Sequence, residues 1–438
     1  MEALEFYKEE FARFLGQRSH EAAWLQDLRK EAFARFESMG LPTRRTESWK
    51  YTSVKPFVNT PFRVAAEAPA SAPSADVLHD PLVTLKEAHR LVFADGHLVA
   101  DASTLHSLPE GVVLTTLGEA LQGDVDEALQ QFLQLELEKV GEMPFSALNL
   151  AFFTDGLWLS VPKNTELDKP VHLIFASSAQ EQPQLTQVRN LVRAALSSQL
   201  SVVESYVGNE EAPYLTNTVT SVETGKNAFV DHYKLQEESA HGLHIGHIES
   251  FVERDAHFSN HVVHIGGKVV RNEVRSTFVD GSATCTLNGL SIAGQGQSVD
   301  NRTNIEHAKP HCDSFQTYKT ILDGNGKGVF NGKIHVHPDA QKTDAKQNNQ
   351  ALLLSDNCSI NSKPELEIYA DDVKCTHGAT SGYLDDEAMF YLQSRGISTK
   401  DAKGILTFAF ANEVVDTFRN DELAEQLEEY LAHRFRKQ

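Results

Sequence analysis

The stretch TFVDGSATCTLNGLSIAG, residues 277–294, alternates apolar residues with small or polar ones and contains no helical stripe. Runs of the same kind recur from about residue 188 to residue 380, separated by Gly, Asn and Asp. They include FVDHYKL (229–235), HFSNHVVHIGG (257–267), HVHPDAQ (335–341) and LEIYADDVKC (366–375). Alternation with a period of two is typical of β-strands with one buried face. Because no helical stripe lies between the runs, they cannot be joined as βαβ units.

Small residues recur before or within these runs, and the irregular gaps between them are multiples of roughly 14 or 15 residues. These residues are Ala228, Ala256, Ala283, Gly328 and Cys358. Such spacing is expected if one coil of a parallel β-solenoid contains about two runs. Periodicity alone leaves a jelly roll or a β-sandwich as the alternative.

The N-terminal part of the chain favours helices. In residues 2–38 a helical stripe is formed by Tyr7, Phe11, Phe14, Leu15, Leu25, Leu28, Ala32 and Phe36, and it ends at Gly40 and Pro42. We therefore predict a helical region over 1–62, an Ala/Pro/Ser-rich linker over 63–76, a mixed α/β segment over 77–160 and the strand-rich core over 161–383. Within the mixed segment, LVFADGHLV (91–99) predicts a hairpin around Asp95-Gly96, and residues 126–140 have helical composition.

Helices return in a C-terminal region over 384–438. Asp385 and Ser398 are suited to cap two helices, and Asp421 to begin a third whose Leu423, Leu427, Tyr430 and Leu431 lie on one face. The middle helix has more apolar surface than one stripe requires, through Phe408, Phe410, Val414, Val415 and Phe418. Such residues are either core or a docking surface for a partner.

The composition excludes several classes of function. The 438 residues include 41% hydrophobic ones and carry a formal charge of −21, which disfavours binding to nucleic acid or to anionic membranes. No apolar run approaches the roughly 20 residues of a membrane span. The N-terminus, MEALEFYKEEFARF, is acidic and amphipathic rather than a secretory signal, so we expect a cytoplasmic location. The four cysteines contain no C-x-x-C pair, which argues against a disulfide framework or a self-contained metal site; they are Cys285, Cys312, Cys358 and Cys375.

Residues 372–398, DVKCTHGATSGYLDDEAMFYLQSRGIS, place a thiol and an imidazole two positions apart in an extended segment. Cys375 and His377 would then share one strand face, and both are metal ligands, so they could hold half of a site that another chain completes. Val373 lies on the same face, which leaves open that Cys375 is a small hydrophobe of the interior.

Three other candidate sites are weaker. Gly324-Asn325-Gly326-Lys327-Gly328 lacks the spacing and the hydroxyl of a phosphate loop and predicts a turn. His335 and His337 share a strand face but have Gln341 where a cupin-like site needs a glutamate, so alternation favours two outward polar residues. A dense histidine group has no recognisable ligand motif; it comprises His241, His244, His247, His257, His261 and His264.

Four sequence blocks resemble the SufD family of the SUF iron–sulfur cluster assembly system in order and spacing. They are LPTRRTESWKYT (41–52), IEHAKPHCDSFQTYKTILDG (305–324), VFNGKIHVHPDAQKTDAKQNNQALLLSD (329–356) and PELEIYADDVKCTHGA (364–379), and they span most of the chain. The related SufB subunits carry a VEHEAT-type motif where this chain has Lys374-Cys375-Thr376-His377, which favours SufD. The resemblance implies a mainly β fold, a right-handed parallel β-helix with helical regions at both ends.

The resemblance also implies a function without catalysis. Such a chain would be a scaffold that pairs with SufB through the β-helix, docks the SufC ATPase through its C-terminal helices and supports iron acquisition and nascent cluster formation. Cys375 and His377 occupy the positions of the SufD contribution to a site at the SufB junction, and Phe408, Phe410, Val414 and Phe418 those of a docking surface. The isolated chain would hold no cofactor and form a homodimer, whereas the complex would hold a transient iron–sulfur cluster and reduced FAD.

A stand-alone β-helix enzyme acting on acidic polysaccharide is the alternative function. Asp371 and Asp372 would be its candidate carboxylates. The acidic composition and the lack of a secretory signal suit such an enzyme poorly.

Overall fold

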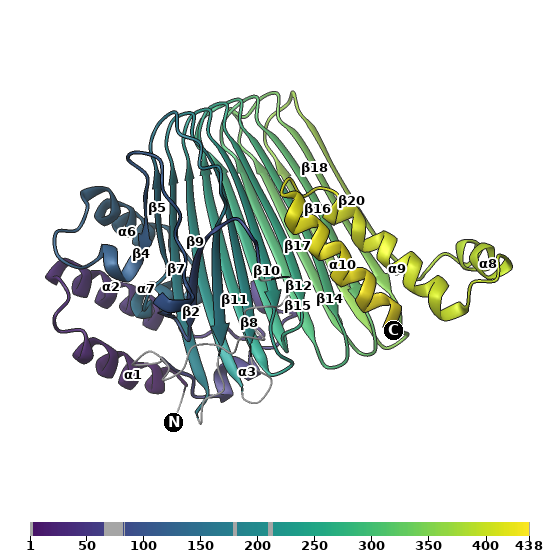
Figure 1. The fold of residues 1–438 in the computed structure, drawn as a ribbon, viewed down its shortest axis with the longest axis horizontal. Coiled ribbons are helices and arrows are strands. Elements are labelled where there is room, and N and C mark those ends of the chain that lie inside the picture. The colour runs from purple at the N-terminus through teal and green to yellow at the C-terminus, as the bar shows by residue number, and fades with distance from the viewer. Residues whose placement is uncertain (1–2, 65–81, 83, 178–181, 209–212, 438) are drawn as a thin grey trace.

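The computed structural model describes residues 3–64, 82, 84–177, 182–208 and 213–437. Most of these residues form a solenoid of two facing sheets with helices at both ends (Figure 1). Sheet 1 contains, in spatial order, β19 (Ser359–Ile368), β17 (Lys327–Val336), β15 (Ser298–His307), β13 (Val269–Phe278), β11 (Gly242–Val252), β9 (Tyr214–Thr224), β7 (Gln184–Ala194), β5 (Leu157–Val161) and β4 (Val113–Thr116), with β1 (Arg63–Val64) beside β7. Sheet 2 contains β20 (Lys374–Gly382), β18 (Asp344–Leu353), β16 (Asp313–Leu322), β14 (Thr284–Ala293), β12 (His257–Ile265), β10 (Phe229–Glu237), β8 (Gln199–Gly208), β6 (Val171–Ser177), β2 (His89–Ala94) and β3 (His97–Leu98).

Successive strands alternate between the two sheets, and each strand from β7 to β20 pairs in parallel with the strand two positions away in the sequence. Thr284 lies beside Asp313 and Ser298 beside Lys327, which are 29 residues apart in both cases. One coil therefore contains two strands. The predicted parallel β-helix with two runs per coil is confirmed, and the jelly-roll and sandwich alternatives, which require antiparallel strands, are wrong.

The corner that leads into sheet 2 repeats from coil to coil. A residue in the left-handed region, with φ between 54° and 61°, precedes a fully buried alanine; the pairs are Asn227–Ala228, Asp255–Ala256 and Ser282–Ala283. The alanine belongs to the core, and the equivalent corner positions of later coils are taken by other small buried residues, Cys312 and Thr343. Three of the small residues noted in the sequence therefore mark one corner. Gly328 lies in β17 and Cys358 before β19, both in sheet 1.

The N-terminal helices cover the outer face of sheet 1 at the start of the solenoid (Figure 1). They are α1 (Ala3–Gln17), α2 (Ala23–Met39), α3 (Lys55–Asn59), α5 (Leu117–Ala120), α6 (Glu127–Lys139) and α7 (Pro144–Phe152), with the 3-10 turn η1 (Glu47–Trp49). A second 3-10 turn, η3 (Ala100–Ala102), packs on β2 of sheet 2. The stripe predicted over 2–38 forms two helices, because the chain turns at 18–22 and packs α1 back onto α2. The predicted hairpin is confirmed, with Asp95 and Gly96 at positive φ between β2 and β3.

Three C-terminal helices follow β20, and the predicted caps are confirmed. They are α8 (Asp386–Ser394), α9 (Thr399–Val415) and α10 (Asp421–Lys437). Asp385 accepts a hydrogen bond from the N–H of Ala388, and Ser398 accepts one from that of Asp401. Helices α9 and α10 lie across the outer face of sheet 2, whereas α8 extends beyond the last strands (Figure 1). None of the described helices is long and apolar enough to span a membrane.

Strands of both sheets lie on either side of the predicted boundary at residue 161. β2, β4 and β5 come before or across it and belong to the same two sheets as the later coils. Residues 65–76 of the predicted linker lie outside the described residues.

Candidate functional site

The C-terminal end of the solenoid brings Cys375 and His377 to one face of β20. They lie beside Ala345 and Gln347 of β18, which are both buried inside the solenoid. Cys375 packs with Val373 against Ala345, and it is half-buried, whereas His377 is exposed. The predicted shared strand face is therefore present. It is the interior face of the last coil, left open because no described strand follows β20.

The environment of Cys375 keeps the thiol protonated in the absence of a metal. Burial raises the pKa of Cys375, and the nearby Asp344 raises it further. Among the described residues, Cys375 and His377 belong to no group of three potential ligands with donor atoms within 4.8 Å of one another. To bind a metal here, the thiol of Cys375 must lose its proton and further donor atoms must be added. Positive charge on a partner would favour the thiolate, and side chains of that partner would supply the missing donors.

The outer edges of β19 and β20 are the second feature of this end. Each strand has a hydrogen-bonded neighbour on one side, β17 and β18 respectively. Lys374 donates its N–H to the carbonyl of Thr343, on the side of β18. Because N–H directions alternate along a strand, the N–H groups of Cys375, His377 and Ala379 point away from β18, toward the open edge. A row of such groups is a template for another strand.

The solenoid interior contains a buried charged cluster, of which only His244 was a candidate from the sequence. Nε2 of His232 lies 3.1 Å from the carboxylate of Glu204, and Nδ1 of His244 lies 2.7 Å from that of Glu238. Burial opposes ionisation of Glu204, but His232, Lys234 and Thr220 outweigh it and lower the pKa to about 2. Burial also lowers the pKa of Lys234 to about 8, although Glu204 and Glu238 oppose this. Once the interior face was fixed by Leu200 and Val202, alternation would have placed Glu204 inside.

The histidine group between residues 241 and 264 does not form one site. His244 and His264 lie inside the solenoid, and His247 lies on the outer face of sheet 1. His257 stacks on Phe229, and His261 packs under the C-terminal helices against Phe418. Burial lowers the pKa of His261 to about 3 and that of His264 well below its usual range. These buried histidines are therefore neutral at physiological pH.

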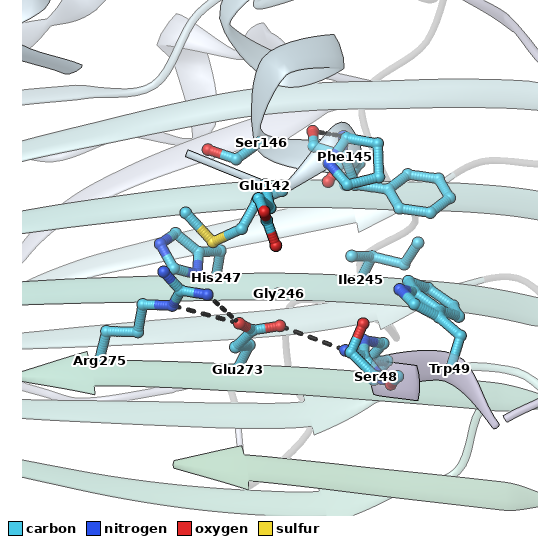
Figure 2. A pocket seen from close by; sticks show the side chains of 14 residues that line it. Ser48, Trp49, Glu142, Phe145, Ser146, Ile245, Gly246, His247, Glu273 and Arg275 are labelled. Atoms are coloured by element: carbon cyan, nitrogen blue, oxygen red, sulfur yellow. Dashed lines mark hydrogen bonds and ion pairs between the residues drawn. The ribbon is translucent and has the colours of Figure 1, made fainter. Parts of the chain in front are cut away.

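A pocket of about 150 Å³ lies between the outer face of sheet 1, η1 and the start of α7 (Figure 2). Glu273 accepts hydrogen bonds from Arg275 at 2.9 Å and from Arg271 at 3.3 Å. Burial raises the pKa of Glu273, but the two guanidinium groups outweigh it and lower the pKa to about 2. Arg271 also donates to the carbonyl of Ser48 and lies 4.1 Å over the ring of Trp49. The charged groups of Glu273, Arg271 and Arg275 thus pair with one another. Through Arg271 they also fix the LPTRRTESWKYT block (41–52) on the sheet.

The other residues singled out in the sequence lie away from the Cys375–His377 pair, in turns, in corners or on the outer face of sheet 1. Gly324 has a φ of 58° in the turn between β16 and β17, as predicted for this glycine-rich segment. His335 and His337 face outward from sheet 1, opposite the buried Ile334 and Val336, also as predicted. Gln341 is held in the corner, where it donates to the carbonyl of Pro338 and accepts from the N–H of Asp372. Asp372 also pairs with Lys342 on the surface, and Asp371 is exposed beside it.

The apolar residues of α9 pack mainly within the chain. Val414 and Phe418 are buried against sheet 2, and Phe408 and Phe410 are partly buried there. No residue of α8 is buried, and Phe390 and Tyr391 are 72% and 57% exposed. Phe390 and Tyr391 of α8 are thus more exposed than any large apolar side chain of α9, where Ile405 is 46% exposed.

Comparisons with known proteins place this chain in one family, with matches that cover most of its length. A family model described as SUF system FeS cluster assembly, SufBD core domain, matches residues 175–410, and one described as SufBD protein N-terminal region matches residues 3–173. The iron–sulfur cluster assembly protein SufD of Escherichia coli is 33% identical over 89% of this chain and 88% of its own length. A SufBD family iron–sulfur cluster assembly protein of Synechocystis is 32% identical over 86% of this chain and 84% of its own length. Together with the parallel β-helix and its open last coil, these matches show that the chain belongs to the SufBD family of the SUF iron–sulfur cluster assembly system and is of the SufD type.

Proposed function

We propose that this chain is a non-catalytic scaffold subunit that pairs with SufB, docks the SufC ATPase and supports iron acquisition and nascent cluster formation. The observation that carries the proposal is the pair Cys375 and His377 on the open interior face of the last coil. A partner β-helix that continues the solenoid at β20 would bring its own side chains onto this face. The pair would then become part of a closed site at the junction.

Docking of SufC is assigned to the C-terminal helices. Val414 and Phe418 fix α9 on sheet 2, and Phe408 and Phe410 extend that packing toward the surface. The exposed Phe390 and Tyr391 on α8 supply the apolar contact. This division of roles fits a helix that extends beyond the sheets and buries none of its own residues.

The cluster is the cargo of the scaffold and binds transiently. Cys375 would ligate iron as a thiolate, and its raised pKa means that the metal or the partner must displace a proton. Neutral imidazole needs no such step, so His377 is the better first ligand at neutral pH. Reduced FAD is proposed as a component of the complex, and no residue of this chain is assigned to it.

The test compares His377→Ala and Cys375→Ala in the complex reconstituted with SufB and SufC. Both variants should assemble and keep their thermal midpoints, because Cys375→Ala costs about 1 kcal/mol of packing at most and His377 is exposed. Iron and sulfide content should fall in both, and more in His377→Ala. Thr376→Ala is the matched control, because Thr376 lies between the two residues on the opposite strand face. Normal iron loading of the His377→Ala complex would refute the assignment.

A further inference from the structure

A second group of metal-ligating side chains lies on the outer face of sheet 1. Glu306 is near the end of β15, His335 is near the end of β17, and His337 follows β17 directly. Glu306 and His335 are paired residues of neighbouring coils. Nδ1 of His335 and Nε2 of His337 lie 2.7 and 3.1 Å from the same carboxylate oxygen, and one donor atom from each residue lies within 4.8 Å of the others. Glu306, from the neighbouring coil, thus supplies the carboxylate ligand that a site with His335 and His337 needs and that Gln341 cannot provide.

The geometry is close to that of a bound ion. Zinc bonds to imidazole nitrogen and carboxylate oxygen are about 2.0–2.2 Å long, so neighbouring ligand atoms of a tetrahedral ion lie about 3.3 Å apart. The observed separations are 2.7 and 3.1 Å, so the carboxylate must move away from the imidazoles by about 0.2–0.6 Å to reach this value. The side chains of Glu306, His335 and His337 are 27%, 24% and 40% exposed, so an ion can enter from solvent.

The carboxylate of Glu306 has a further partner on its own strand. Nδ2 of Asn304 donates to the other carboxylate oxygen of Glu306 at 3.1 Å. Such an outer hydrogen bond orients a metal-ligating carboxylate. The ring of Tyr369 packs edge-on against that of His335.

We propose that Glu306, His335 and His337 bind one divalent transition-metal ion of the Fe²⁺–Zn²⁺ class. Two imidazoles and one carboxylate suit these borderline ions, whereas Mg²⁺ and Ca²⁺ prefer oxygen ligands alone. Three protein ligands leave a fourth position of a tetrahedral ion open. The site differs from the Cys375–His377 pair, which lies on the interior face of sheet 2, and it does not depend on the scaffold function.

The test is calorimetric titration of the full, untagged and metal-stripped chain with Zn²⁺, and anaerobically with Fe²⁺. One ion should bind per chain, and Mg²⁺ should give no heat. Glu306→Gln and His335→Ala should each weaken binding at least about tenfold, since loss of an outer partner alone costs on the order of 10- to 100-fold. Tight binding of either ion supports the site, and their relative affinities name its metal.

Glu367→Gln provides the matched control. Glu367 lies beside His335 in β19, on the side opposite Glu306, but its carboxylate pairs with Lys333 at 2.9 Å. This variant should bind the ion as the native chain does, as should the double variant Cys375→Ala/His377→Ala. Unchanged affinity in a folded Glu306→Gln variant, checked by circular dichroism, would overturn the proposal. Loss of the ion in the Cys375→Ala/His377→Ala variant would also overturn it, because the ion would then bind elsewhere.

Discussion

Several histidines in this chain are buried with neutral hydrogen-bond partners, which links folding to pH at single residues. His172, His261 and His307 each have a pKa of about 3, mainly because burial disfavours the charged imidazole. His172 meets the hydroxyl of Ser205 at 2.9 Å and His307 that of Ser314 at 2.9 Å, both neutral partners. In the unfolded chain the same groups titrate near 6.5. The unfolded state therefore takes up protons first as the pH falls.

We expect the unfolding free energy to fall as the pH falls from 6.5 toward 3, because unfolding then binds protons that the folded state excludes. Each such histidine contributes up to about 1.4 kcal/mol per pH unit in this window. In the His261→Gln variant, the decrease in unfolding free energy between pH 6.5 and pH 5 should be smaller than in the native chain by up to about 2 kcal/mol. Urea unfolding at both pH values measures this, with His433→Gln, an exposed residue of α10, as the control. Equal pH slopes for His261→Gln and the native chain would contradict it.

At the scale of the element, the corner before each strand of sheet 2 combines a left-handed residue with a small buried one. Ser282 has a φ of 61°, and its N–H donates to the carbonyl of Pro310 in the next coil. A β-branched residue in this conformation is strained by about 1–2 kcal/mol, whereas glycine is not.

Ser282→Val should therefore lower the unfolding free energy by about 1–2 kcal/mol, while Ser282→Gly should change it by less than about 1 kcal/mol. Ser282 is exposed, so packing differences between the variants are small. Thermal or urea unfolding of the two variants beside the native chain checks the prediction. A Val variant as stable as the Gly variant would show that the corner tolerates another backbone conformation.

The sequence predicts these elements because their signals are local. Strand alternation and caps such as Asp385 depend on a few neighbouring residues, and the structure has them where predicted. The lateral neighbours of a strand depend on coil length, which varies: Leu215 pairs with Leu243, 28 residues on, and Lys327 pairs with Ser359, 32 residues on. When the length of a coil changes by four residues, a different side chain comes to lie beside each position of the neighbouring strand. For this reason Glu306 could not be placed next to His335 in advance, nor Glu204 next to His232.

At the scale of the whole molecule, the two ends of the solenoid differ. The first coils carry helices α1, α2, α6 and α7 on sheet 1, whereas β19 and β20 have largely exposed side chains and an unpaired edge (Figure 1). Open edges of this length associate unless they are blocked. Because of this asymmetry, we expect association at the end that carries Cys375 and His377.

The last prediction is that the isolated chain forms a homodimer through this edge at concentrations on the order of tens of micromolar. Ala379 has its N–H directed outward, as the donation from Lys374 to Thr343 and the strand alternation require. Ala379→Pro removes that donor and leaves the ladder with β18 intact, so it should shift the chain toward monomer in multi-angle light scattering. Ala379→Ser keeps the N–H and should remain dimeric. A native chain that is monomeric, or an Ala379→Pro variant as dimeric as Ala379→Ser, would exclude pairing through β20.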